Sequence, residues 1–307
     1  MATNNTLNDG KSSFVISYQV LLVQVFVSVS LCINFLQITT FFMKDFFYTT
    51  MRYILFAVTL VSDCLFLFIT DVLLLLSYLS VTTQMWLCLI IYIVLSLYTF
   101  VTPVTLTAMT LERYVAICMP LRHGELCSTR NTMHCILIIH GLSSVPCIIF
   151  LSIFFASSTQ SFYTQGRICS VEIFIFHSWQ GHLRAAISQF YFLIMCIAIV
   201  FSYFKILKVA KAASGQNKSS SWKGLRTVVL HAFQLLLGLI QLWCPFIEAA
   251  VLQINVMLFV KVRYFNYITF IIAPRCLSPL IYGLRDEKFF LALKYYALCG
   301  LSRIYFD

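Results

Sequence analysis

The sequence predicts an all-α membrane protein, a bundle of seven transmembrane helices followed by a short amphipathic helix. First, 61% of the 307 residues are hydrophobic and only 10% are charged, whereas soluble domains carry roughly 25% charged residues. Second, the chain contains seven apolar runs, each long enough to cross a bilayer. Third, most Lys and Arg residues lie in loops on one side of these runs. So little polar sequence cannot cover a water-exposed surface, and one membrane domain is expected.

The apolar runs define the transmembrane elements. About 20 residues at 1.5 Å per residue are needed to cross roughly 30 Å of hydrocarbon. Several runs exceed this minimum, which predicts that their helices tilt or protrude beyond the bilayer. The predicted helices span residues 14–43, 51–80, 85–118, 132–156, 184–209, 227–252 and 262–284.

The loop between the fifth and sixth runs predicts the orientation, because all of its charged residues are basic. Basic loops stay on the cytoplasmic side. Residues 1–13 are then an extracellular amino terminus, 14–284 the membrane domain, and 285–307 a cytoplasmic helix and tail. The basic residues expected in the cytoplasm are Lys44, Arg52, Arg113, Arg122, Arg130, Lys205, Lys208, Lys211, Lys218, Lys223, Arg226, Arg285, Lys288, Lys294 and Arg303. Those expected outside are Lys11, Arg167, Arg184, Lys261 and Arg263.

This distribution also explains the net charge of +10. No basic face alternates with stacking aromatic residues in the manner that single-strand nucleic-acid binders need. The expected surroundings are therefore a lipid bilayer, and no nucleic-acid partner is expected.

Two glycosylation sequons provide a weak check on the orientation. Asn4-Asn5-Thr6 lies on the side predicted to be extracellular, so Asn4 is the expected glycosylation site. Asn217-Lys218-Ser219 lies in the basic loop and should never be modified.

The segment after the seventh run has helical amphipathic spacing. Its apolar residues recur on one face of residues 286–298, and Lys288 and Lys294 lie elsewhere. Such a helix can lie flat in the inner membrane interface. Cys299 beside it is expected to be either palmitoylated or a free cytosolic thiol. The apolar residues are Phe289, Phe290, Leu293, Tyr296 and Ala297.

The 12 cysteines divide by compartment. Only Cys88 and Cys169 lie at or near the outer, oxidising face, so we expect a disulfide between them. Most of the others lie within helices, where cysteine behaves as a small buried hydrophobe. No CxxC pair and no Cys/His cluster has metal-ligand spacing, so no metal site and no cofactor are expected.

The inner end of the third run carries a specific motif. MTLERYVAICMPLRH, residues 109–123, resembles the hallmark of odorant receptors within the rhodopsin-like (class A) G-protein-coupled receptors. The resemblance implies a switch in which Glu112 holds Arg113 in the resting state and activation frees Arg113, beside Tyr114, for the G protein. Glu112 departs from the aspartate usual in odorant receptors, but the charge is kept. The alternative is a pair of exposed interface charges.

The seventh run ends in a second motif, PRCLSPLIYGLRDEKF, residues 274–289. It resembles the family's asparagine-proline-xx-tyrosine switch, with Ser278 at the asparagine position, Pro279 as the helix breaker and Tyr282 as the moving tyrosine. The serine variant, together with Glu112, resembles odorant receptors of bony fish. Tyr203, preceded by serine, resembles the family's Ser-Tyr pair.

The family pattern also has gaps. The fourth run lacks the usual tryptophan and the fifth lacks the usual proline.

A charge pair is expected inside the membrane. Counting 1.5 Å per residue from the inner helix ends places Asp63 about 18 Å and Arg275 about 14 Å deep. Charges at this depth usually face the bundle interior and pair. In class A receptors the corresponding aspartate commonly helps to hold sodium, so we expect Arg275 to replace that ion here. Alternatively, Arg275 bonds backbone carbonyls, or the helix registers differ from those assumed.

The resemblance implies a ligand cavity among the outer halves of helices three, five, six and seven. Apolar walls with a few hydroxyls suit a small organic molecule, although helix-facing aromatics often serve packing alone. Glu248 is either a rim residue in water or a pocket charge for a polar or cationic ligand. The carried-over positions are Leu95, Ser96, Thr99, Phe100, Ser188, Tyr191, Trp243, Phe246, Glu248, Ile268 and Ile271.

The function implied by the resemblance is that of a plasma-membrane odorant receptor. It would bind a small organic odorant and activate a stimulatory heterotrimeric G protein, which raises cyclic AMP. One alternative is a class A receptor for an amine, a peptide or another small ligand. A transporter or channel, with Asp63 and Arg275 as a proton relay, is less consistent with the motifs. An enzyme is not expected, because no HExxH or GxSxG pattern appears.

Overall fold

The structure is a computed structural model. The structure describes residues 2–159, 162–163, 165–213, 246–277, 279 and 287–297, together with a few positions between 233 and 244. Side chains are described from residue 17 onward.

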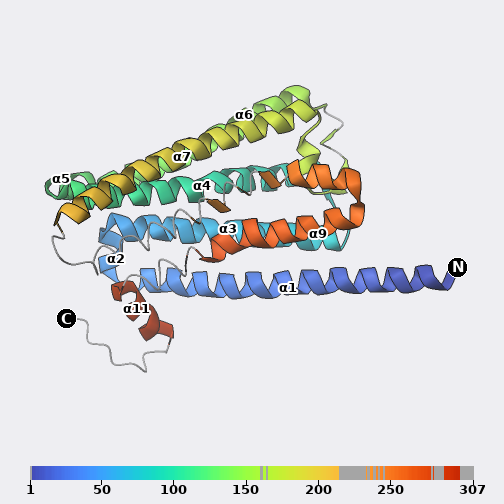
Figure 1. The fold of residues 1–307 in the computed structure, drawn as a ribbon, viewed down its shortest axis with the longest axis horizontal. Coiled ribbons are helices and arrows are strands. Elements are labelled where there is room, and N and C mark those ends of the chain that lie inside the picture. Colours follow the sequence, from blue (N-terminus) through green and yellow to red (C-terminus); the bar gives the residue numbers. More distant parts are fainter. Residues whose placement is uncertain are drawn as a thin grey trace.

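Long helices that run side by side dominate the structure (Figure 1). They are α1 (Ala2–Phe42), α3 (Met51–Tyr78), α4 (Met85–Cys118), α6 (Thr129–Ser157), α7 (Ser178–Ala213) and α9 (Val256–Asn266). Six described stretches are long and apolar enough to cross a membrane, the last being Val256–Leu277. They match predicted helices one to five and seven. The sixth, residues 227–252, lies largely outside the described residues, although residues 246–254 are helical.

The seventh membrane helix changes its winding along its length. It begins at Val256, earlier than the predicted residue 262, because the Asn255 side chain accepts hydrogen bonds from the backbone amides of Met257 and Leu258. Such caps satisfy amides that have no partner within a helix. After α9, the six residues Tyr267–Ile272 form a π-helical segment. The helix is therefore locally widened just before Arg275.

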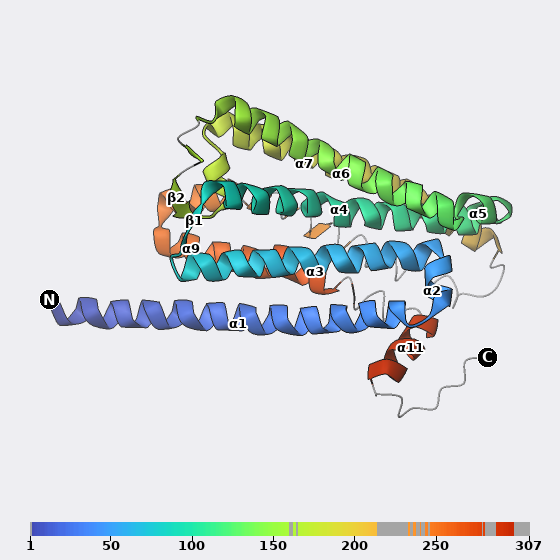
Figure 2. The same cartoon turned by 180° about the vertical axis from the view of Figure 1, so that it is seen from behind.

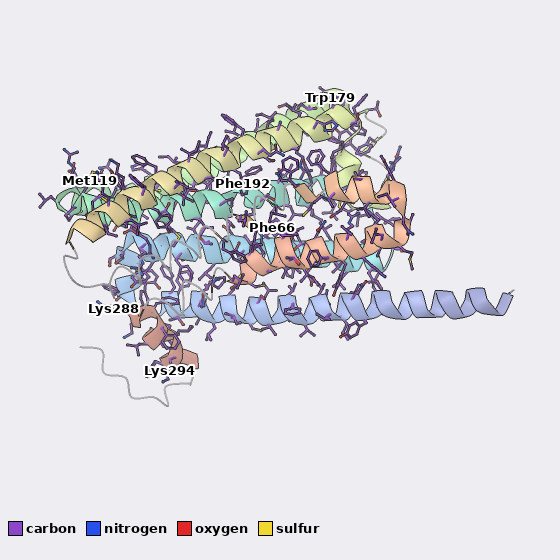
Figure 3. All side chains as sticks on the ribbon, viewed as in Figure 1. Phe66, Met119, Trp179, Phe192, Lys288 and Lys294 are labelled. Atoms are coloured by element: carbon purple, nitrogen blue, oxygen red, sulfur yellow. A yellow bond between two sulfur atoms is a disulfide. The ribbon has the colours of Figure 1, made fainter. Side chains whose placement is uncertain are left out.

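Two short helices lie at the same end of the bundle as the carboxyl-terminal helix. They are α2 (Asp45–Thr49) and α5 (Pro120–Leu126), and Pro120 suits the first turn of α5 because that position needs no amide donor. Helix α11 (Glu287–Ala297) confirms the predicted amphipathic helix. We call this end the α11 end; Figure 3 labels Met119, Lys288 and Lys294 there and Trp179 at the opposite end.

Helix α11 is fixed to the bundle by aromatic packing. The Phe289 side chain is 1% exposed and lies against Phe47, Tyr53 and Phe56 of α2 and α3 at ring-centroid distances of 5.3, 6.4 and 5.5 Å. Ala292 is also fully buried, whereas Phe290 is 37% exposed. The buried side of the helix thus holds Phe289 and Ala292, and Phe290, which the sequence placed on the apolar face with Phe289, is exposed.

A small sheet lies at the opposite end (Figure 2). A disulfide lies there too, and we call this end the disulfide end. Strand β1 (Thr82–Gln84) pairs antiparallel with β2 (Gly166–Ile168), and a 3-10 turn, η2 (Val171–Phe174), follows. The predicted Cys88–Cys169 disulfide is confirmed, with the two Cα atoms 5.6 Å apart. The loop between α6 and α7 is therefore tied to the start of α4.

Helix α4 holds the centre of the described bundle, since it packs against α3, α6 and α7. Its candidate residues lie at different positions along the helix axis. Leu95 lies toward the disulfide end, Thr102 near mid-helix and Glu112 near the α11 end, and all three are buried. One helix thus carries residues of the candidate ligand region, of the charge pair and of the expected switch.

Candidate functional site

A buried charge pair joins three helices in the middle of the bundle. Arg275 Nη1 of the seventh helix donates to Asp63 Oδ1 of α3 at 2.8 Å. Thr102 Oγ1 of α4 donates to the same carboxylate oxygen at 2.9 Å and accepts from Arg275 Nη1 at 3.2 Å. The Asp63 and Arg275 side chains are 0% and 7% exposed. The structure therefore brings together the two charges that helical depth predicted to pair.

The remaining faces of the Arg275 guanidinium are also covered. Nη2 donates to the Tyr98 carbonyl at 3.4 Å, and the guanidinium carbon lies 3.5 Å from the Phe66 ring centroid. Figure 3 places Phe66 in the interior of the bundle. An arginine over an aromatic face gains from the ring quadrupole, most strongly when it is desolvated. The pair is thus built into a shell of polar and aromatic contacts that suits a buried charge.

The expected activation switch lies at the α11 end. Glu112 is buried, and its Oε1 lies 3.3 Å from His123 Nε2 of α5. Tyr203 of α7 is buried in a cluster with Ile199 and Ile206, against which Tyr114 of α4 packs. Two of the predicted switch tyrosines are therefore in one cluster, on facing helices.

The seventh-helix part of the switch is described only in part. Ser278 and Tyr282 lie outside the described residues. Pro279 is buried, and its carbonyl accepts a hydrogen bond from Gln37 Nε2 at 3.0 Å. Gln37 of α1 was not among the predicted site residues. It is one of three glutamines in the first apolar run, and the sequence does not distinguish it from Gln19 and Gln24.

The partners of Glu112 include a residue that the sequence analysis did not connect with it. Cys127, directly after α5, joins Glu112 and His123 in a group whose ligand atoms all lie within 4.8 Å of one another. Burial raises the pKa of the Cys127 thiol, and the Glu112 carboxylate raises it further. His123 and Cys127 are four residues apart, a spacing that places two side chains on one helix face.

Four residues of the predicted ligand site are buried on α4 and α7, and Ser96 of α4 also contacts Cys147 of α6. Leu95, Ser96, Phe100 and Ser188 are all buried. The Phe100 ring meets the Tyr191 ring edge-on at 5.6 Å. Apolar and hydroxyl side chains are thus buried in one region.

Two other predicted ligand residues bond to the protein itself. The Thr99 hydroxyl donates to the Leu95 carbonyl at 2.7 Å. The Tyr191 hydroxyl donates to the Leu142 carbonyl of α6 at 3.3 Å. These hydroxyls therefore serve the packing of the helices in this arrangement.

The sixth-helix candidates contact the elements around the disulfide end. Trp243 is 50% exposed, with its ring 6.0 Å from that of Phe246. Phe246 stacks on His182 of α7 at 5.9 Å. Glu248 accepts a hydrogen bond from Asn266 Nδ2 at 3.0 Å and lies 4.0 Å from Arg263 Nε, so its carboxylate links the sixth and seventh helices.

The two seventh-helix candidates differ in their neighbours. Ile268 packs against a cluster of Val23, Val27, Leu67 and Ile272, between α1, α3 and the seventh helix. Ile271 is half-buried. The structure therefore does not bring Ile268 together with the candidates on α4 and α7.

An arginine outside the predicted set lies beside the candidate ligand region. The Arg184 guanidinium lies 5.8 Å from the Tyr92 ring centroid and 5.9 Å from that of Phe150. The Tyr92 ring also packs against the Phe174 ring of η2, with the two ring centroids 4.8 Å apart. From the sequence, Arg184 is expected only as an outer basic residue, because aromatic partners on other helices leave no local pattern.

Comparison with known proteins agrees with this architecture. The family model described as 7 transmembrane receptor (rhodopsin family) matches residues 15–282. "Odorant receptor 131-2" of Danio rerio is 43% identical over 300 residues, which cover 97% of this chain and 92% of that protein. "Galanin receptor 2a" of Danio rerio is 26% identical over 66% of this chain and 56% of its own length. The chain therefore belongs to the rhodopsin family of seven-transmembrane receptors and closely resembles a fish odorant receptor.

Proposed function

We propose that this chain is an odorant receptor that binds a small organic molecule and activates a stimulatory heterotrimeric G protein, which raises cyclic AMP. The observation that carries the proposal is the 43% identity to a Danio rerio odorant receptor over 97% of the chain. Identity over almost the whole length includes the helices that would form the ligand site as well as the switch motifs.

The buried residues between α4 and α7 support a small, mostly apolar ligand. Leu95 and Phe100 supply apolar surface, and the Ser96 and Ser188 hydroxyls supply a few polar groups, all of them buried. Small-molecule sites combine mainly apolar walls with a few placed polar groups. The ligand would lie in the half of the bundle toward the disulfide end.

The proposed mechanism is a shift between two arrangements of the helices. A ligand that binds one arrangement more tightly increases its population. In the receptor family the active arrangement exposes the arginine that corresponds to Arg113 to the G protein. Glu112, Tyr114 and Tyr203 pack around this region at the α11 end, which would then face the cytoplasm.

A receptor for a peptide or an amine is the second candidate, favoured by the likeness to "Galanin receptor 2a" of Danio rerio. Glu248 is the acid among the predicted ligand residues that such a cationic ligand would meet. It is half-buried and already bonded to Asn266. Because this acid has partners within the protein, the odorant function is the better supported of the two.

The test is a cyclic AMP assay in cells that express the full chain and a stimulatory G protein. An odorant panel is screened in parallel with amine and peptide panels. An odorant-dependent rise that is lost in Arg113→Ala, at equal surface expression, supports the proposal. A response only to amines or peptides would favour the second candidate, and ligand-dependent uptake or current without a G protein would favour a transporter or channel.

A further inference from the structure

Three potential metal ligands meet at the α11 end, on two different elements. Glu112 lies in the last turns of α4, His123 in α5, and Cys127 directly after α5. His123 Nε2 is 3.3 Å from Glu112 Oε1, and the ligand atoms of all three residues lie within 4.8 Å of one another. A carboxylate, an imidazole and a thiol are thus gathered at one point.

The local structure explains why these three residues meet. Met119 ends α4 and Pro120 starts α5, so the chain turns back and α5 packs against α4. His123 and Cys127 are one helical turn apart and share a face. That face is directed at Glu112, whose side chain is 6% exposed, whereas that of His123 is 37% exposed. The group therefore has one buried member and an opening to solvent.

The ligand set selects a class of ion. Nitrogen and sulfur donors with one carboxylate favour borderline-soft divalent cations such as Zn²⁺ over Mg²⁺ or Ca²⁺, which prefer oxygen donors. With Zn–ligand bonds of about 2.0–2.3 Å, tetrahedral ligand atoms lie ~3.5 Å apart. Because the ligand atoms lie within 4.8 Å of one another, the group exceeds this spacing by at most about 1.3 Å, which rotation of the half-exposed His123 side chain can supply.

We propose that Glu112, His123 and Cys127 form a binding site for a divalent transition-metal cation of the Zn²⁺ type at the α11 end of the receptor. The three side chains supply three ligands and leave the fourth tetrahedral position to water, as in open zinc sites. Cys127 binds as the thiolate and gives up its proton when the metal enters. The bound cation connects the end of α4 to α5.

The site also predicts a regulatory effect, which rests on the proposed function. Glu112 precedes Arg113, the residue expected to engage the G protein. In the switch that the family resemblance implies, Glu112 holds Arg113 in the resting state. A cation that takes the Glu112 carboxylate as a ligand weakens this hold. The population of arrangements with Arg113 released therefore rises with metal concentration, and coupling to the G protein rises.

Metal titration of the purified full-length receptor in lipid nanodiscs tests the site without any odorant or G protein. Co²⁺ is the optical probe, because tetrahedral thiolate coordination gives visible d–d bands and a sulfur-to-cobalt charge-transfer band. Zn²⁺ is then added to displace it. Cys127→Ser and His123→Gln each remove one ligand. Cys118→Ser is the matched control, because Cys118 is another free cysteine near the same end of α4 and lies outside the group.

The wild-type chain should bind one Co²⁺ with a charge-transfer band that Zn²⁺ abolishes. Cys127→Ser should lose that band, and His123→Gln should bind at least about 100-fold more weakly, since even outer-shell partners of metal ligands contribute 10–100-fold. Cys118→Ser should behave as wild type. Equal titrations of the wild type and both ligand variants, or loss of the band in Cys118→Ser alone, would overturn the site.

Two further measurements separate the causes of a negative result. Thermal unfolding of each variant shows whether it is folded, and the two ligand variants test the site independently of each other. Nucleotide exchange on a stimulatory G protein tests the regulation: Zn²⁺ should speed exchange with the wild type and not with Cys127→Ser. If no variant supports exchange, the proposed function fails while the Co²⁺ titration still decides the site.

Discussion

Arg275 shows how a charge is accommodated in the middle of a membrane protein. An isolated charge at the bilayer centre costs several kcal/mol. Here the guanidinium meets a carboxylate, a hydroxyl, a carbonyl and an aromatic ring, contributed by α3 and α4. Because every contact comes from another helix, the pair also fixes how α3, α4 and the seventh helix fit together.

Removal of Arg275 should destabilise the receptor strongly. Arg275→Leu leaves the fully buried Asp63 carboxylate without its cation, which costs about 3–5 kcal/mol for a broken buried pair. Asp63→Asn combined with Arg275→Leu should recover part of this loss, because no charge remains unpaired. The thermal unfolding of purified variants measures both effects. Arg263→Leu is the matched control. The Arg263 side chain is 47% exposed, and its ion pair with Glu248 is long, at 4.0 Å, so its loss should cost much less.

The same variant should acquire sensitivity to sodium. Asp63 without Arg275 offers a buried anionic oxygen pair, and a sodium ion can supply the missing charge. Arg275→Leu should therefore unfold at a higher temperature in sodium than in choline chloride, whereas the wild type should show no difference. Sodium-independent stability and signalling at wild-type levels in Arg275→Leu would contradict the role assigned to the pair.

The buried charge pair and the proposed metal site differ in how far the sequence could predict them. Asp63 and Arg275 are rare charges within long apolar runs, and helix rise alone gives their depth. Glu112, His123 and Cys127 lie at helix ends, where the direction of the chain after Met119 decides which residues meet. Helical spacing relates His123 to Cys127, but nothing in the sequence relates either of them to Glu112 before the turn at Met119 is known.

At the scale of single elements, α11 is held by a few side chains. Phe289 is the largest of the fully buried side chains described, and its ring is enclosed by aromatic rings from α2 and α3. An 11-residue helix is marginal on its own, because isolated helices shorter than about 12–15 residues are unstable in water. Its position therefore depends on this contact.

Phe289→Ala should detach α11 from the bundle. The expected loss is about 3–5 kcal/mol, typical of large buried aromatic residues that are replaced by alanine. Phe290→Ala is the control, because Phe290 is the adjacent residue and is 37% exposed. Hydrogen exchange of the α11 backbone should increase in Phe289→Ala and remain unchanged in Phe290→Ala. Equal protection of α11 in the two variants would show that the aromatic contact does not hold the helix.

The disulfide end depends on a covalent link between two elements. Cys88 and Cys169 are separated by 81 residues along the chain, so the bond restricts a long loop in the unfolded state. Loss of such a bond typically costs about 2–5 kcal/mol. Cys88→Ser, Cys169→Ser and the double variant should be destabilised equally, because each removes the same bond. Cell-surface expression and thermal unfolding measure the loss of stability. A double variant that is destabilised by the sum of the two single losses would contradict the prediction.

Element boundaries were the part of the fold that hydropathy predicted least well. Helix α1 begins at Ala2 instead of residue 14, because hydropathy reports where a helix enters the membrane and not where its hydrogen bonds begin. Helices α2 and α5 were not predicted, since both are short connections that hydropathy treats as loops. The π-helical segment Tyr267–Ile272 has no hydropathy signal either, because an extra residue in one turn leaves the composition unchanged.

At the scale of the whole molecule, the described basic residues divide between the two ends of the bundle. Lys44, Arg122, Lys288 and Lys294 belong to the short helices or their caps at the α11 end (Figure 1). Arg52, Arg113, Arg130, Lys205 and Lys208 lie toward the same end, on the long helices. The disulfide end has Arg167 of β2, Arg184 near the start of α7, and Lys261 and Arg263 of α9. The positive-inside rule applies to loops near the ends of membrane helices. The larger basic content of the α11 end therefore favours its placement in the cytoplasm.

This arrangement predicts the orientation of the chain in the plasma membrane. An epitope tag before residue 2 should be accessible to antibody on intact cells, and a tag after residue 307 only after permeabilisation. A glycan on Asn4 should make the wild-type chain sensitive to glycosidase, and Asn4→Gln should remove that sensitivity. Asn217→Gln is the matched control and should change nothing, because the basic loop never enters the lumen. Surface labelling of the carboxyl-terminal tag on intact cells would reverse the orientation and remove the α11 end, with Arg113, from the reach of a G protein.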